Sequence, residues 1–102
     1  MPVAYLIEFT PEALRHFAAL DARQRAIVRD VLRAQLLHQP ALETRHRRRL
    51  RPNTLAGYRL SVRDLRVYYD VVEVPAALVL VQAIGIKVRN RVMIGGEEID
   101  LT

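Results

Sequence analysis

The chain has 102 residues, a formal net charge of +5 and no cysteine. This length predicts one domain, residues 1–102, and the lack of cysteine excludes both a disulfide framework and a cysteine-ligated zinc site. Glu8 interrupts the first apolar segment, and the longest apolar run, around residues 78–81, is far too short to cross a bilayer. We therefore expect a cytoplasmic protein without a signal peptide or membrane segment. No metal or cofactor is expected either.

The first forty residues predict a strand followed by two helices. Residues 3–9 alternate loosely, with Val3, Tyr5, Ile7 and Phe9 at every second position, and this predicts a strand. Thr10, which a proline follows, can cap the first helix, and Asp21 with Gln24 forms a capping box for a second helix that runs to about His38. Apolar residues at helical spacing are expected to face the core: Ala13, Leu14, Phe17 and Leu20 in the first helix, and Ile27, Val28, Val31 and Leu32 in the second.

An arginine-rich segment without any acid follows the helices. Between Glu43 and Asp64 lie His46 and seven arginines: Arg45, Arg47, Arg48, Arg49, Arg51, Arg59 and Arg63. A GC-rich genome explains fifteen arginines against one lysine in the whole chain, but it does not explain why they cluster. Like charges repel one another unless water or an anion compensates them, so the segment favours a polyanionic or acidic partner over an exposed, solvated loop. Residues 45–51 are themselves predicted to be a loop.

The next two predicted strands carry arginines on one face only. Alternation places Tyr58, Leu60, Val62, Leu65, Val67, Tyr69 and Val71 on an apolar face, and Arg59, Ser61, Arg63, Arg66, Tyr68 and Asp70 on the opposite one. Because guanidinium groups bind phosphate with a planar fork, the second face is a candidate surface for phosphate or RNA. The alternative is an ordinary sheet face with solvated arginines.

Residues 78–86 are almost continuously apolar, which is typical of a central strand covered on both faces. The predicted order is therefore β-α-α-β-β-β. It describes an α+β fold in which a helical hairpin packs on one face of a small, mainly antiparallel sheet, while the face with the arginines stays open. No further strand is predicted in the tail, which contains Gly95-Gly96 and ends acidic.

In the order and spacing of several segments the chain resembles the RelE/ParE family of bacterial type II toxin–antitoxin toxins. The segments are Phe9-Thr10-Pro11-Glu12-Ala13, Arg49-Leu50, Gly57-Tyr58-Arg59, Arg66-Val67-Tyr68-Tyr69 and Ile84-Gly85-Ile86-Lys87. The resemblance implies a compact sheet packed on two helices, a RelE-like fold. It also implies a cognate antitoxin as partner, with which the chain would form a hetero-oligomer, and the ribosome with its mRNA as the target, since RelE-like members cut mRNA there without a metal.

The resemblance also implies roles for particular residues. Arg66 would stabilise the transition state, Arg59 and Lys87 would position phosphates, and Arg89 would lie with Lys87 after the last strand. The other expected RNA contacts are Arg45, Arg47, Arg48, Arg49, Arg63 and Tyr68, the last by stacking on a base.

Two departures from the family pattern concern catalysis. Ser61 stands where RelE-like ribonucleases carry a lysine, and Met93 lies near the position of their C-terminal tyrosine. Arginine is a poor base because it hardly ever deprotonates. Of the three histidines, His46 lies in the basic segment and is the candidate general base, whereas His16 and His38 are expected to be structural or solvated.

Two other functions stay open at this point. ParE-like members share the fold, poison DNA gyrase and need no nuclease site. The chain could also be a non-catalytic basic module that binds an antitoxin or RNA.

Overall fold

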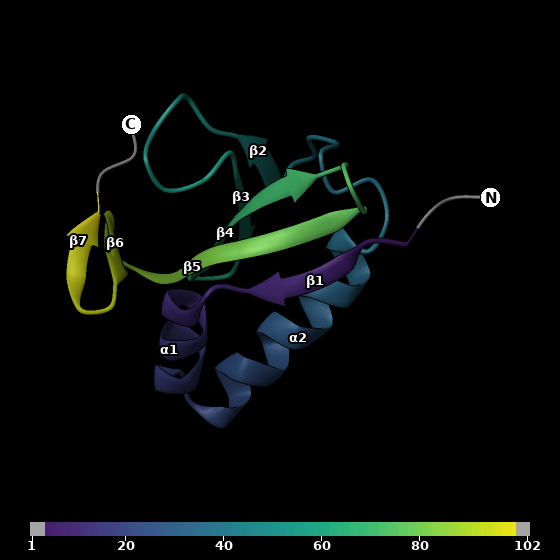
Figure 1. Ribbon diagram of the computed structural model, residues 1–102. Coiled ribbons are helices and arrows are strands. Elements are labelled where there is room, and N and C mark those ends of the chain that lie inside the picture. The colour runs from purple at the N-terminus through teal and green to yellow at the C-terminus, as the bar shows by residue number, and fades with distance from the viewer. Residues whose placement is uncertain (1–3, 100–102) are drawn as a thin grey trace.

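The computed structural model describes residues 4–99 (Figure 1). In chain order its elements are β1 (Leu6–Phe9), α1 (Pro11–Ala19), α2 (Ala22–Leu36), β2 (Arg47–Arg49), β3 (Tyr58–Val62), β4 (Leu65–Val72), β5 (Leu78–Val88), β6 (Arg91–Ile94) and β7 (Glu97–Ile99). The strands form one sheet in the order β2-β3-β4-β5-β6-β7, and β1 pairs with β5. Both helices lie on the same side of the sheet (Figure 1), which confirms the α+β fold with a helical hairpin on a mostly antiparallel sheet.

The long strand β5 organises the sheet. On one side it pairs antiparallel with β4, and on the other it pairs with β1 in parallel over Leu78–Val81 and with β6 over Ile86–Val88. His16 fills the gap between β1 and β6, because its Nδ1 accepts a hydrogen bond from the backbone N–H of Ile84 at 3.3 Å. Burial lowers the pKa of His16, and the charge of Arg15 lowers it further, which suits a neutral ring that accepts at Nδ1. The structural role expected for His16 is thus a backbone contact with β5.

Both helices begin at the predicted caps. Thr10 accepts a hydrogen bond from the N–H of Ala13 at 3.1 Å, and Asp21 and Gln24 form the complete capping box. The second helix ends at Leu36, two residues before the predicted end. Leu14 was expected to face the core, and this is wrong: the side chain is 54% exposed.

Apolar side chains are buried on both faces of the sheet. The main cluster lies between sheet and helices and includes Val28, Leu32, Leu36, Leu60, Val67, Tyr69, Val79 and Val81. A smaller cluster of Ala56, Tyr68, Ala83 and Ile94 lies on the opposite face, with Leu50, Leu55, Val92 and Ile99 packed against it. The face predicted to be open is therefore covered in part by the loop 50–57 and by the hairpin of β6 and β7.

Three short strands escaped the sequence prediction. Arg47–Arg49 forms β2, paired antiparallel with β3, where a loop was predicted. The strands β6 and β7 form a hairpin across Gly95-Gly96, whose positive φ angles of 58° and 83° glycine adopts without strain. The first strand begins at Leu6, and Val3 of its predicted range lies outside the described residues. Within residues 4–99, neither helix has the length and apolar character that a bilayer span needs.

Candidate nucleic-acid interface

Four cationic side chains share the face of the sheet that points away from the helices. Directly opposite residues of neighbouring strands project to the same side, and Arg48 lies opposite Arg59. Arg66 lies opposite Ser61, and Ser61 faces the same side as Arg59, two positions away in β3. On its other side Arg66 lies opposite Gly85, which faces the same side as Lys87, two positions away in β5. We call the surface formed by Arg48, Arg59, Arg66 and Lys87 the cationic face. The structure thus brings together the three predicted active-site cations, Arg59, Arg66 and Lys87.

Arg59 and Arg66 lie close enough to Tyr68 to influence its ionisation. Burial raises the pKa of the Tyr68 phenol, while the positive charges of Arg59 and Arg66 act in the opposite direction. Burial lowers the pKa of the Arg66 guanidinium, and the neighbouring charge of Arg59 lowers it further. Two half-buried guanidinium groups that repel one another form a local concentration of positive charge, which an anion would relieve.

The side chain of Tyr68 is not available to stack on a base. It is 2% exposed and packs in the smaller apolar cluster with Ala56, Ala83 and Ile94. The prediction that Tyr68 stays on an open surface is therefore wrong. Alternation assigned it to the correct face, but the loop 50–57 and the β6–β7 hairpin cover that face at this position.

No carboxylate within residues 4–99 forms an ion pair with the cationic face, and Asp64 acts on Arg66 only through its charge, which raises the pKa of the guanidinium against the effect of burial. The ion pairs found in these residues join Glu12 to Arg15 at 3.6 Å and Arg91 to Glu98 at 3.7 Å, and neither includes a residue of the acid-free segment. The Nε of Arg59 is buried without a hydrogen-bond partner in the same residues. A guanidinium in this state gains more from an incoming phosphate than a fully solvated one does.

The backbone of the β3–β4 hairpin holds the Arg66 side chain in place. Its Nη1 donates hydrogen bonds to the carbonyl oxygens of Arg63 and Leu65, both at 2.8 Å. These contacts use one nitrogen and leave the other N–H groups of the fork free for a ligand. Arg66 is therefore an oriented donor rather than a freely rotating surface cation.

Arg47 does not belong to the cationic face. Its side chain is 7% exposed, and Nη1 donates hydrogen bonds to the carbonyl oxygens of Gln35 and Gln39, both at 2.9 Å. In β2 it lies opposite Leu60, so it projects to the helical side of the sheet, where it binds backbone carbonyls at the end of α2. The prediction of Arg47 as an RNA contact is corrected to a structural role.

The other predicted residues surround the cationic face. Arg45 and Arg49 are exposed on either side of the buried Arg47. Arg63 is exposed in the β3–β4 turn, and Arg89 is exposed in the turn between β5 and β6. The strand before Arg89 was predicted to be the last of the sheet, but β6 and β7 follow it. Lys87 itself lies within β5.

His46 lies at the edge of β3, next to the row that contains Arg66. The N–H of Ser61 donates to the carbonyl oxygen of His46 at 2.8 Å, and Ser61 in turn lies opposite Arg66. The side chain of His46 is exposed and lines a small pocket with Val31, Gln35 and Arg63, among others. The backbone of His46 is thus next to the cationic face, but its side chain lines a separate pocket.

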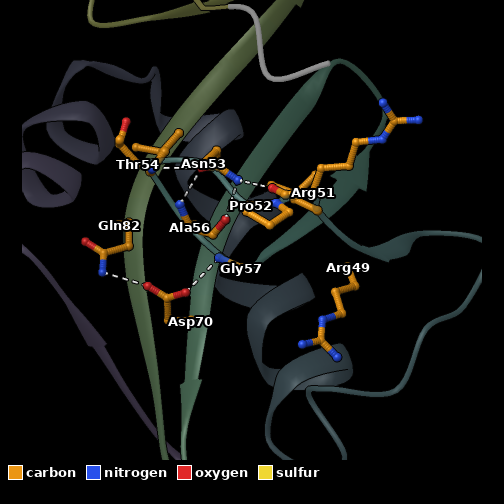
Figure 2. A pocket seen from close by; sticks show the side chains of 11 residues that line it. Arg49, Arg51, Pro52, Asn53, Thr54, Ala56, Gly57, Asp70 and Gln82 are labelled. Atoms are coloured by element: carbon orange, nitrogen blue, oxygen red, sulfur yellow. Dashed lines mark hydrogen bonds between the residues drawn. The ribbon is translucent and has the colours of Figure 1, made fainter.

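The sequence prediction missed a pocket beside the cationic face. It has a volume of about 510 Å3 and is lined by residues 49–57, Asp70 and Gln82 (Figure 2). Asn53 organises the loop: its Oδ1 accepts from the N–H groups of Leu55 and Ala56, while its Nδ2 donates to the carbonyl oxygens of Arg51 and Ala56. Asp70 then fixes the end of the loop, because its Oδ1 accepts from the N–H of Gly57 at 2.7 Å.

Comparisons with known proteins agree with the fold. The structure is similar to the crystal structure of the toxin–antitoxin complex RelBE2 from Mycobacterium tuberculosis, with a TM-score of 0.71, 21% sequence identity, and coverage of 83% of this chain and 93% of the matched chain. The chain therefore has a RelE-like fold, as the sequence predicted. No known family profile matches the chain, and no curated protein matches it.

Proposed function

We propose that the chain is the toxin of a type II toxin–antitoxin system and that it inhibits translation as a ribosome-dependent mRNA endoribonuclease. The observation that carries this proposal is the cationic face: Arg59, Arg66 and Lys87 share one sheet surface, and none of them forms an ion pair within residues 4–99. The RelE-like fold supports it, because the similar solved structure is a toxin–antitoxin complex.

The chemistry expected at this face is stabilisation of charge on phosphate. Cleavage of RNA at a ribose 2′-hydroxyl passes through a pentavalent phosphorane with extra negative charge, which preorganised cations stabilise. Two backbone hydrogen bonds orient the Arg66 side chain, which supports that role for it, and Arg59 and Lys87 would hold the adjoining phosphates. A general base is also needed. His46 is the candidate base, and it would have to turn toward Arg66 from the pocket that its side chain lines with Val31 and Gln35.

The cationic face would also be the docking surface for the cognate antitoxin. A disordered acidic segment that folds onto Arg48, Arg59 and Arg66 would neutralise their charge and block access to the site. We therefore expect the partner to be an acidic, amphipathic peptide segment.

Docking of an acidic antitoxin on the cationic face predicts how its affinity depends on salt and on the charges of that face. Replacing Arg48, Arg59 and Lys87 together with glutamine should weaken antitoxin binding about tenfold, since ion pairs at the surface contribute roughly 0.5 kcal/mol each. The affinity of the parent chain should fall as salt rises, and more steeply than that of the variant. Titration calorimetry at two salt concentrations measures both effects.

The matched control removes the same number of charges from the opposite side of the molecule. Arg23, Arg29 and Arg33 are exposed on α2, and their replacement with glutamine should leave the affinity nearly unchanged. Equal losses in the two triple variants would refute docking on the cationic face.

The second candidate function is a ParE-like gyrase poison. The position of His46 favours it, because the side chain of this candidate base lines a pocket with Val31 and Gln35 of α2 and not the cationic face. Pulse labelling after induction separates the two functions. We expect protein synthesis to stop first, with mRNA cuts on ribosomes and without DNA breaks. An early DNA-damage response with normal translation would instead assign the chain to the gyrase poisons.

A further inference from the structure

A β-bulge places Gln82 beside Asp70 on the face that carries the arginines. Tyr68 lies opposite Ala83 and Tyr69 lies opposite Val81, so Gln82 is the extra residue in β5. Bulges redirect side chains and recur near functional sites. Here the bulge leaves an amide and a carboxylate in contact at the wall of the 510 Å3 pocket (Figure 2).

The hydrogen bonds at this contact determine which way the amide group of Gln82 is oriented. An ionised carboxylate only accepts, and both oxygens of Asp70 are in use: Oδ1 accepts from the N–H of Gly57 at 2.7 Å and Oδ2 accepts from Nε2 of Gln82 at 2.9 Å. Gln82 must therefore turn its NH2 group toward Asp70. Its Oε1 makes no hydrogen bond within residues 4–99 and is not sealed from solvent, so it is an oriented acceptor at the pocket.

The rest of the pocket suits a flat, partly apolar ring attached to phosphates. Leu50, Pro52 and Leu55 supply apolar walls, and Arg49 and Arg51 lie at the same pocket. Its volume falls within the range of about 300–1,000 Å3 that small-ligand sites occupy. The pocket also adjoins the cationic face, because Gly57 is two residues before Arg59 along the chain.

We propose that this pocket accepts one unpaired base of an RNA whose backbone lies on the cationic face, and that Gln82 Oε1 accepts a hydrogen bond from the exocyclic amino group of that base. The proposal rests on the proposed function and gives it a base preference: adenine or cytosine over a base with a carbonyl at the same position. Asp70 is a positioning residue, since it touches the RNA only through the orientation that it gives to Gln82.

The test uses two fluorescent five-nucleotide RNAs of uridine with either adenosine or inosine at the centre. Adenosine has an exocyclic amino group and an accepting N1, whereas inosine has a carbonyl and an N1–H group. The parent chain should bind the adenosine RNA about three- to tenfold more tightly, the effect of one good hydrogen bond. In Asp70→Asn the new Nδ2 can donate to Gln82 Oε1, which turns the NH2 of Gln82 toward the pocket. The preference should then vanish or reverse in favour of inosine.

Two further variants keep the result interpretable. Asp64→Asn makes the same chemical change at an exposed turn of the same sheet and should keep the adenosine preference. Gln82→Met removes the acceptor, leaves Asp70 in place and should bind both RNAs equally. Thermal unfolding confirms that each variant is folded.

The outcomes separate this inference from the proposed function. RNA binding that weakens in Arg59→Ala but does not distinguish adenosine from inosine in the parent chain would overturn the base pocket alone. So would an adenosine preference that survives in both folded variants, Asp70→Asn and Gln82→Met. Binding to neither RNA at low salt would also overturn the base pocket alone, because the proposed function is tested by mRNA cleavage on ribosomes. Absence of that cleavage would overturn both proposals.

Discussion

Replacing Arg66 with alanine is expected to lower the rate of mRNA cleavage on ribosomes about a hundredfold or more and to abolish growth arrest. Loss of a preorganised donor to a developing phosphorane costs about 3 kcal/mol of transition-state stabilisation. The Arg66 guanidinium is held by the carbonyl oxygens of Arg63 and Leu65 and lies beside Arg59 on the cationic face. Single-turnover cleavage with saturating ribosomes measures the chemical step directly.

The matched control for this variant is Arg63→Ala. Arg63 is the same residue type three positions earlier, but it is exposed in the β3–β4 turn, so its loss should change the rate much less. In Arg63→Ala, antitoxin binding and thermal unfolding should both stay close to those of the parent chain. If folded Arg66→Ala arrests growth as the parent does, the site is wrong and the toxin acts through binding alone.

Replacing Arg47 with alanine is expected to destabilise the fold without touching the cationic face. The variant leaves the carbonyl oxygens of Gln35 and Gln39 without their charged donor, and hydrogen bonds to charged groups contribute about 1.5–3 kcal/mol. We expect a loss of about 2–3 kcal/mol in the free energy of unfolding, which lowers Tm by about 10–20 °C for a domain of this size. Urea and thermal unfolding check both numbers.

Arg48→Ala is the matched control, because it makes the same change at the next position of the same strand. Arg48 is exposed and lies opposite Arg59, so its loss should cost less than about 0.5 kcal/mol of stability. Arg48→Ala should instead weaken the binding of RNA or antitoxin. Equal stability of the two variants would show that the Arg47 contacts contribute little to the fold.

Local signals in the sequence were sufficient for the helices and for the faces of the central strands. Thr10 and Asp21 cap their helices as predicted because capping depends on residues three or four positions apart. Alternation assigned Arg59 and Arg66 to one face and Leu60 and Val67 to the other, because a strand has a period of two. The polar Gln82 within an otherwise apolar strand was the available signal for the missed pocket.

The sequence by itself therefore determined the α+β class, the helix boundaries near their caps, and the side of the sheet to which each residue of β3 and β4 points. Only the tertiary structure decided what covers each side. Arg47 and Arg48 are identical neighbours, yet one binds the end of α2 and the other is exposed, because the pairing of β2 with β3 turns them to opposite faces. Tyr68 is buried although it shares a face with the arginines, because the loop 50–57 and the β6–β7 hairpin, both distant from β4 in the chain, pack over it.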